Sequence, residues 1–418
     1  MAKEEKKAPK LRFNGYTNDW ERKEFGDVVE FYSGLTYKPE NIAQSGTLVI
    51  RSSNIHNSQY VNADNVYVKN NIVNSEYVKK QDIVVVVRNG SRNLIGKHAL
   101  LTSIPHNPSV IGAFMTGIRS SDNQFIETLL NTEQFKREIN KNLGATINQI
   151  TTSQFKKMRF HFSKQKENKQ IGVLFTYLDN SINLHERKCE ELTLIKKSLL
   201  QKLFPKEDKI KPEIRYKNFS DAWEQRKFFD NIEKVIDFRG RTPKKLGMKW
   251  SNEGYVALSA LNVKDGYIDF TADVHYANKA LYDKWMVGND LYKGQVLFTT
   301  EAPMGNVAQI PDNQKYVLSQ RTIAFDVFRN KITNDFLAVL LRSQNVQHKL
   351  KSLASGGTAQ GVSQKSLSQL KVTVPTRINE QQKIGEFFKQ LDSLIALHQR
   401  KLEKLKQLKK FLLQNMFI

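Results

Sequence analysis

The fold is decided by a stretch that occurs twice, KQIGVLFTYLDNSINLHERKCEELTLIKKSLLQKLF at residues 169–204 and QKIGEFFKQLDSLIALHQRKLEKLKQLKKFLLQNMF at residues 382–417. A shorter stretch is also repeated, LRFNGYTNDWERKEF at residues 11–25 and IRYKNFSDAWEQRKF at residues 214–228. Between these matched ends each half carries roughly 140 residues that match poorly. A period near 200 residues is too long for a solenoid, so the sequence predicts a tandem of two domains. Because the repeated segments flank two divergent interiors, the sequence indicates one symmetric scaffold that carries two different binding specificities.

The longer repeat has the apolar spacing of an amphipathic helix. Apolar residues recur at alternating steps of four and three, with one interruption at Lys196 that Ile195 partly fills. Neither apolar seam can bury itself and both have the same period, so we expect the two helices to bury each other. The alternative is that each helix docks on its own globular domain. The expected interface residues are Leu178, Ile182, His185, Cys189, Leu192, Leu199, Leu391, Ile395, His398, Leu402, Leu405 and Leu412.

Composition narrows the class of partner. Lys and Arg number 65 against 42 Asp and Glu, which gives a formal net charge of +23 and a pI near 9.7. Positive potential on this scale favours nucleic acid or an anionic membrane. No apolar run approaches the ~20 residues of a bilayer span, and no apolar segment follows the N-terminal lysines as a secretory signal requires. A single cysteine leaves no disulfide framework. The composition therefore predicts a cytosolic nucleic-acid binder without membrane segments.

The interiors mix strand and helix patterns in the same order in both halves. Residues 1–10 are expected to form a flexible arm, and the second long helix is expected to begin near Asn379. β-Branched runs predict strands, and apolar residues at helical spacing predict one helix in each interior. The expected strands are residues 47–55, 82–87, 255–263 and 295–300, and the expected helices are residues 123–143, ending at Leu143-Gly144-Ala145, and 334–350.

Signatures of a catalytic centre are absent from the sequence. The segment 90–98 imitates a phosphate-binding loop, but it has five residues between its glycines, and His98 stands where Ser or Thr should hold Mg²⁺. No Pro-Pro pair is present, which excludes the Asn/Asp-Pro-Pro-aromatic motif of amino-methyltransferases. The eight histidines are scattered beside one cysteine, so no metal-ligand spacing exists. His185 and His398 occupy equivalent seam positions and are interpreted as interface residues. The sequence predicts neither a catalytic site nor a metal site.

Polar loops at matched places in the two halves are the candidate binding elements. RNGSR (88–92) follows the strand that ends at Val87, and TTEAPMG (299–305) holds the matched place in the second half. In the major groove Arg pairs bidentately with guanine and Asn with adenine, and Glu accepts from the cytosine amino group. The alternative is that these loops are solvated turns. The candidate DNA-binding residues are Lys38, Arg51, Ser53, Asn54, Arg88, Asn89, Ser91, Arg92, Lys97, Asn148, Gln149, Arg239, Arg241, Thr242, Lys244, Lys245, Asn262, Thr299, Thr300, Glu301, Gln320, Arg321, Thr358 and Gln360.

Essentially the whole chain resembles the specificity subunit of type I restriction–modification enzymes. The resemblance is carried by LDxxIxLHxRK, beginning at Leu178 and Leu391, by the LLQxxF endings, and by the loops RNGSRNLIGKHAL, VLFTTEAPMGNVA and LSQRTIAF. It implies a mixed α/β (α+β) fold with two pseudo-symmetric target recognition domains, residues 1–165 and 206–377. It also implies two long antiparallel helices, residues 166–205 and 378–418, which separate the domains and form a coiled coil. The lead into the first helix departs from the family, since Ser163 stands where the second copy has Pro375.

The resemblance also implies a function. Each domain would read one half-site of a bipartite double-stranded DNA target, and the helix pair would set the gap between half-sites. Two modification subunits would methylate adenine with S-adenosylmethionine, and two restriction subunits, where the system also cleaves, would use ATP with Mg²⁺. This chain would bind neither cofactor, and the complex would lie in the cytoplasm of a bacterium or archaeon, associated with the nucleoid. The main alternative is a stand-alone sequence-specific DNA-binding protein. A coiled-coil scaffold would leave the charge and the duplicated loops unexplained.

Overall fold

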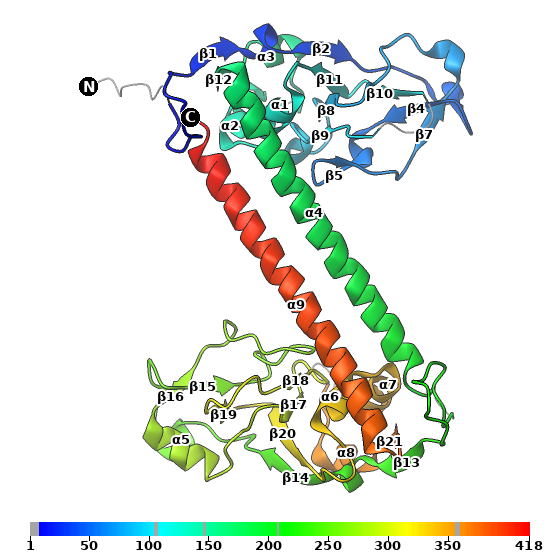
Figure 1. Ribbon diagram of the computed structural model, residues 1–418, viewed down its shortest axis with the longest axis vertical. Helices are drawn as coiled ribbons and strands as arrows, with labels where there is room; N and C mark the ends of the chain where they lie inside the picture. The colour runs from blue at the N-terminus through cyan, green and yellow to red at the C-terminus, as the bar shows by residue number, and fades with distance from the viewer. Residues whose placement is uncertain (1–7, 104–107, 145–147, 207–208, 356–359) are drawn as a thin grey trace. The chain divides into compact units, whose positions relative to one another are not determined.

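The computed structural model describes residues 8–103, 108–144, 148–206, 209–355 and 360–418. They form two compact units (Figure 1). Unit 1 comprises residues 1–185 and 400–418, and unit 2 comprises residues 186–399. Both boundaries between the units fall within the long helices α4 (Gln165–Lys202) and α9 (Ile378–Asn415), so each unit contains part of both.

Unit 1 is built on an antiparallel sheet and a second, mixed sheet. The first has the order β2 (Glu30–Ser33), β11 (Met115–Arg119), β8 (Ile83–Val86), β9 (His98–Leu100). The second has the order β10 (Ser109–Ile111), β4 (Thr47–Ile50), β7 (Val66–Val68), β3 (Ile42–Ala43), with β10 and β4 parallel. Two strand pairs are β1 (Glu21–Glu24) with β12 (Arg159–Phe162), and β5 (Ile55–His56) with β6 (Gln59–Tyr60). Helices α1 (Asn123–Leu130), α2 (Glu133–Asn142) and α3 (Thr152–Lys156) precede α4.

Unit 2 repeats this order. Its antiparallel sheet is β14 (Ile232–Asp237), β20 (Thr322–Val327), β17 (Val296–Thr299), β18 (Val307–Gln309). Its second sheet is β16 (Tyr276–Ala277), β15 (Tyr255–Leu258), β19 (Val317–Leu318), with β15 and β19 parallel. The strand pair is β13 (Glu224–Lys227) with β21 (Lys371–Val374). Its helices are α5 (Lys279–Met286), α6 (Asn334–Arg342), α7 (Gln344–Leu353) and α8 (Gln364–Gln369), followed by α9. The predicted mixed α/β fold with internal pseudo-symmetry is confirmed.

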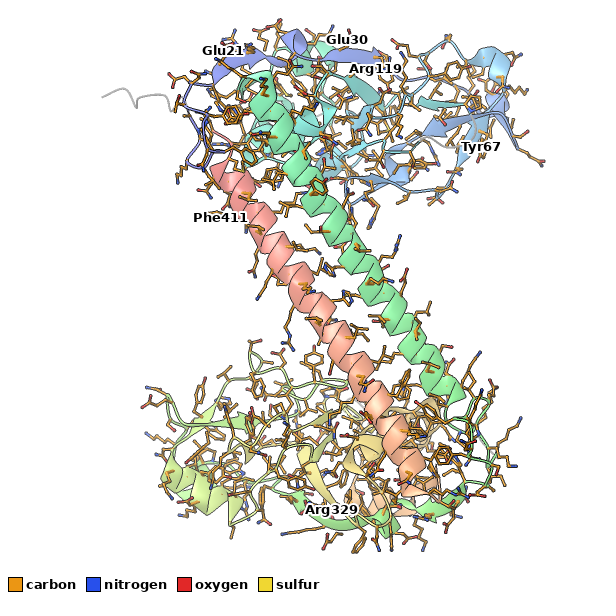
Figure 2. The ribbon with its side chains drawn as sticks, viewed as in Figure 1. Glu21, Glu30, Tyr67, Arg119, Arg329 and Phe411 are labelled. Carbon is orange, nitrogen blue, oxygen red and sulfur yellow. The ribbon has the colours of Figure 1, made fainter. Side chains whose placement is uncertain are left out.

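The central strand of each unit lies between two cores, which explains its unbroken apolar sequence. Alternate side chains of a strand point to opposite faces. Ile83 and Val85 of β8 pack with α1 and α2, while Val84 and Val86 pack with the second sheet. In β17, Phe298 and Leu297 divide between two cores in the same way. The end of this rigid strand is therefore a fixed point in each unit. Figure 2 labels Arg119 and Glu30, register partners on β11 and β2, which lie at the opposite end of this sheet, beside the start of β8.

Each predicted interior helix is two helices, which corrects the sequence prediction. In unit 1 the break lies at Asn131-Thr132, because the Thr132 hydroxyl accepts a hydrogen bond from the Phe135 backbone N–H and caps α2. In unit 2 it lies at Ser343, whose extended backbone ends α6 and whose hydroxyl donates to the Leu340 carbonyl. Residue Ala145 of the predicted stop lies outside the described residues, as do residues 1–7 of the expected arm.

The strands predicted at 47–55 and 255–263 are shorter than expected. They end at Ile50 and Leu258, and turns follow. In the first turn the Asn54 side-chain oxygen accepts from the Arg51 backbone N–H, and in the second Asn262 accepts from Ser259 in the same way. Side chains of this kind compete with the sheet ladder for backbone groups.

The long helices are confirmed, and within each unit they run side by side and antiparallel (Figure 1). In unit 1, Phe175 lies against Phe417, and Asp179 accepts a hydrogen bond from Lys409 at 2.5 Å. In unit 2, the equivalent pair is Lys196 with Asp392 at 2.6 Å. The predicted interface residues are buried or half-buried. The helices therefore bury each other, and they also dock on the globular parts, since Ile171 and Phe175 of α4 pack in the core of unit 1.

One detail of the helices differs from the sequence prediction. Ile195 does not fill the interruption in the seam, because its side chain is 48% exposed. Lys196 itself occupies that position, with Asp392 as its partner. Helix α9 begins at Ile378, as predicted, and its first turn makes tertiary contacts: Glu380 accepts from Arg215, and Gln381 accepts from the Thr333 backbone N–H.

Candidate nucleic-acid interface

The loop after β8 is held by two neighbouring loops of unit 1. The backbone N–H groups of Val87 and Arg88 both donate to the Phe114 carbonyl, at 3.0 and 3.2 Å. On the other side, Ile150 N–H donates to the Val87 carbonyl at 2.9 Å, and Arg88 bridges to Gln149. The predicted loop 88–92 therefore lies together with residues 148–150, and both lie beside the turn that contains Phe114.

Side chains extend this frame to the loop after β4. Asn89 donates to the Ser52 hydroxyl at 3.4 Å, and Lys97 donates to the Ser52 carbonyl at 3.0 Å. The Asn148 amide donates to the Gly90 carbonyl at 3.0 Å. Three loops predicted separately from the sequence thus form one surface at the end of β8. We name this surface loop cluster 1; it comprises residues 51–54, 88–92, 112–114 and 148–149.

Loop cluster 2, residues 259–262, 299–306, 319–321 and 360–361, is its counterpart in unit 2. Thr300 N–H donates to the Arg321 carbonyl at 2.8 Å, and Val362 N–H donates to the Thr300 carbonyl at 2.9 Å. Glu301 bridges to Gly361. These bonds repeat the bonds of loop cluster 1 position by position, so Glu301 corresponds to Arg88 and Arg321 corresponds to Phe114. The two backbone frames match while the side chains differ.

The exposed side chains at the frame are paired in both units. The Arg88 guanidinium lies over the Phe114 ring, 5.0 Å from its centroid, and the ring is 54% exposed. A cation over the face of an aromatic ring is attracted by the ring quadrupole. In unit 2 the Arg321 guanidinium lies 3.8 Å from the Glu301 carboxylate, and these side chains are 52% and 40% exposed. Each unit therefore presents an exposed arginine at this frame, over an aromatic ring in unit 1 and beside a carboxylate in unit 2.

Four predicted contact residues are buried, and the expectation that they face DNA is wrong for this structure. Asn54 and Asn262 are fully buried and their amides donate to backbone carbonyls of their own loops. Thr299 accepts from the Asn306 N–H at 2.9 Å, and Thr300 donates to the Arg321 carbonyl at 3.2 Å. The physical reason is that short polar side chains at strand ends satisfy backbone groups that the ladder leaves unpaired. These residues shape the loops.

The segment 239–245 is linked at its start to helix α8, which follows loop cluster 2. Asp237 accepts from Arg239 at 2.9 Å and from Gln364, which follows the cluster, at 2.7 Å. Burial alone would raise the pKa of the Asp237 carboxyl, but these hydrogen bonds outweigh burial and hold that pKa below its ordinary value. Arg241 lies 4.2 Å over the Phe238 ring and donates to the Trp285 carbonyl, so its role is structural. Of the rest, Thr242 caps a turn by accepting from Lys245 N–H, and Lys244 and Lys245 are exposed.

The remaining predicted residues fall into three groups. Lys38 is exposed and lies 3.8 Å from Glu40, with no described hydrogen bond to loop cluster 1. Arg51 donates to the Asp64 carbonyl and Arg92 to the Gly144 carbonyl. Ser53, Ser91, Gln320 and Gln360 are exposed on the clusters or at their edges, and Thr358 lies outside the described residues.

Phe114 is the residue that sequence reasoning missed. Its signal was the internal repeat: IGAFMTGI (111–118) occupies the place that LSQRTIAF (318–325) has in unit 2. The described residues include no group of three or more His, Cys, Asp and Glu that could hold a metal ion. None of the described helices is long and apolar enough to cross a membrane.

Comparisons with known proteins agree with this architecture. The family model described as type I restriction modification DNA specificity domain matches residues 17–194 and again residues 221–407. The chain is 25% identical over 411 residues to the putative type I restriction enzyme MjaX specificity subunit of Methanocaldococcus jannaschii, covering 94% of this chain and 91% of that protein. It is 22% identical over 382 residues to the EcoKI specificity subunit of Escherichia coli, covering 87% and 80%.

A solved structure has the same fold. The crystal structure of a type I restriction-modification system S subunit from M. genitalium aligns with a TM-score of 0.67 at 15% identity, covering 98% of this chain and 99% of that chain. At this identity the likeness concerns the fold alone. Since the two segments matched by the family model make up most of the chain, the protein belongs to the family of type I restriction modification DNA specificity domains.

Proposed function

We propose that this chain is the DNA specificity subunit of a type I restriction–modification system and that each unit reads one half of a split double-stranded target. The observation that carries the proposal is the pair of loop clusters, whose hydrogen-bonded backbone frames match while their exposed side chains differ. A repeated frame with divergent side chains is what two readers of different sequences require. Base edges are distinguished by side chains, whereas backbone contacts to phosphate carry no sequence information.

The charge of the chain supports DNA as the ligand. A formal net charge of +23 supplies sequence-independent attraction to the phosphate backbone. The loop clusters would add the preference for particular bases. The continuous helices α4 and α9, each of 38 residues, would set the gap between the half-sites.

Exposed apolar side chains on the helices support docking of two modification subunits. Leu184 and Leu408 are exposed in unit 1, and their equivalents Leu397 and Ile195 are exposed in unit 2. Phe411 adds a further exposed ring on α9 (Figure 2). Because the same positions are apolar and exposed in both units, one subunit would engage two copies of the same partner. The modification subunits would use S-adenosylmethionine, and restriction subunits would use ATP with Mg²⁺. The complex would work in the cytoplasm, at the nucleoid.

Exchange of one interior tests the proposal. Residues 11–165 are replaced by the matching stretch of a relative, the chain is co-expressed with its modification subunit, and methylated adenines are mapped across the host DNA. One half-site should change and the other should stay. Simultaneous change of both half-sites would contradict independent readers, and methylation by the purified chain alone would contradict a non-catalytic subunit. Sequence-specific binding that never leads to methylation with the partner would favour a stand-alone DNA-binding protein.

A further inference from the structure

We infer that each unit reads a G·C pair through one arginine, Arg88 in unit 1 and Arg321 in unit 2, and that Phe114 and Glu301 are the positioning residues that orient these two guanidinium groups. The inference rests on the proposed function and names the base pair and the side chains. Glu301 then orients Arg321 and does not itself accept a hydrogen bond from a cytosine amino group.

The candidate arginines differ in whether their guanidinium groups already donate hydrogen bonds within the chain. Arg51, Arg92, Arg239 and Arg241 each donate side-chain hydrogen bonds to other groups of the chain. The guanidinium groups of Arg88 and Arg321 donate none to the described residues; Arg88 is held over a ring, and Arg321 faces a carboxylate at 3.8 Å. A guanidinium carries five N–H donors in a fixed fork, and two of them match O6 and N7 of guanine. Only these two candidates combine exposure with a full set of donors.

The exposed arginine occupies a different position of the backbone frame in each unit. At the strand end unit 1 has Arg88 and unit 2 has Glu301, while at the neighbouring turn unit 1 has Phe114 and unit 2 has Arg321. The arginine therefore stands on opposite sides of an equivalent backbone frame. This difference would place the two guanidinium groups differently against their half-sites, although both would read the same kind of base pair.

Phe114 and Glu301 are the neighbours that orient the two arginines. The Phe114 ring holds Arg88 by its face and so consumes none of its donors. The carboxylate of Glu301 can only accept hydrogen bonds, and it carries the same charge as the DNA phosphates. A facing cation such as Arg321 offsets the repulsion between this carboxylate and the phosphates. Arg321 is the more exposed member of its pair, at 52% against 40%. Glu301 is accordingly the group that orients, and Arg321 is the group that extends toward a ligand.

The test uses the full chain in complex with its modification subunit and a library of DNA duplexes with randomised half-sites, from which methylated products are sequenced. Arg88→Ala should lose discrimination at one G·C pair of one half-site by about 5- to 150-fold, and Arg321→Ala should do so in the other half-site. Phe114→Leu should lose about 2- to 5-fold at the same pair as Arg88→Ala, and Phe114→Tyr, which keeps the ring, should retain the wild-type preference. Glu301→Gln should weaken the pair lost by Arg321→Ala by a few-fold, on the order of an exposed ion pair.

Matched controls lie in the same units. Tyr77→Leu removes another exposed ring of unit 1. The backbone carbonyl of Tyr77 accepts from Arg119, which lies at the other end of β11 from Phe114. Arg329→Ala removes an arginine that follows β20, whereas Arg321 precedes it (Figure 2). Both controls should keep the wild-type preference at every position.

Several outcomes would overturn the inference while leaving the proposed function intact. They are a loss in Glu301→Gln at a different base pair from Arg321→Ala, an unchanged preference in Phe114→Leu, and a uniform loss at all sequences in Arg88→Ala, which indicates a phosphate contact. Failure of the proposed function is distinct, because the wild-type complex would then show no split-site methylation at all.

Discussion

At the scale of the residue, two glycines show how closely the long helices approach the globular parts. A Cβ on Gly172 would lie 2.6 Å from the Phe125 backbone nitrogen, and a Cβ on Gly385 would lie 2.8 Å from the backbone carbonyl carbon of Asp335. Both contacts are with the first turns of equivalent helices, α1 and α6. Backbone atoms cannot move aside as a flexible side chain can, so the glycines permit α4 and α9 to dock.

Substitution Gly172→Ala should destabilise the protein by about 1–3 kcal/mol, the cost of overpacking. The sign is informative, because alanine in a helix is otherwise favoured over glycine by about 1 kcal/mol. Thermal unfolding of the full chain measures the effect. Gly90→Ala is the control, since none of the described residues beyond its chain neighbours lies within 4 Å of its Cβ position. An increase in Tm for Gly172→Ala would show that α4 can move away from α1 without cost.

At the scale of the element, the interruption in the apolar seam has a structural purpose. Lys196 and Lys409 stand at equivalent places in α4 and α9, and each pairs with the aspartate of the other helix within its own unit. A purely apolar seam can slide by one heptad, whereas a charged pair at one position fixes the register. Asp392 does more than Asp179, because it also accepts from the buried Arg342 at 2.8 Å.

Asp392→Asn should therefore cost more free energy of unfolding than Asp179→Asn. We expect about 1–3 kcal/mol for Asp392→Asn, because it removes the charge facing a cation that is buried in α6. Hydrogen exchange should report the loss in α6 and in the first half of α9. Equal effects of the two substitutions would mean that the bond from Arg342 contributes nothing.

At the scale of the whole molecule, the first residues of unit 1 are bonded to the end of α9 in the same way as residue 214 of unit 2 is bonded to the end of α4. Leu11 N–H donates to the Asn415 carbonyl at 2.9 Å, and Ile214 N–H donates to the Lys202 carbonyl at 3.0 Å, at the equivalent place in unit 2. Phe417 and Phe204 likewise pack on Trp20 and Trp223, with ring centroids 6.0 and 5.9 Å apart. The C-terminal end of α9 thus packs on the start of unit 1, as the C-terminal end of α4 packs on the start of unit 2.

A circular permutant should consequently fold. Joining Ile418 to the N-terminal residues and opening the chain between Pro205 and Ile214 exchanges two equivalent connections and keeps both contacts. The permutant should retain the wild-type pattern of methylation with its partner and a Tm within a few degrees. A permutant opened inside β8, which lies between two cores, is the control and should not fold. If the permutant opened between Pro205 and Ile214 did not fold, the covalent connection 205–213 would be required for stability beyond the contacts that the permutant keeps.

The gap between half-sites gives a further prediction for the whole molecule. Because α4 is tied to α9 on both sides of Glu190, by Asp179 and by Lys196, an insertion in α4 alone would shift one ion pair out of register. Four residues inserted after Glu190 and four after the equivalent Glu403 lengthen each helix by ~6 Å and keep the seam on nearly the same face. With DNA rising ~3.4 Å per base pair, the preferred gap should grow by one or two base pairs.

Methylation of sites that differ only in gap length measures this preference. Insertions of two residues rotate the seam by ~200° and should unfold the helix pair. An unchanged gap in the folded four-residue variant would mean that other elements set the spacing.

By itself the sequence determined the tandem, the long helices, the central strands and the places of the matched polar loops. These features follow from local periodicity and from self-similarity, which report which residues are apolar and which segments correspond. Only the tertiary structure decided that Asn54 and Asn262 are buried, that Lys196 has a partner in Asp392, and that Phe114 faces Arg88. Each of these depends on contacts between segments that are distant along the chain or on hydrogen bonds that compete with the sheet. Periodicity does not encode such contacts, because packing and the pairing of backbone groups select them only when the chain has folded.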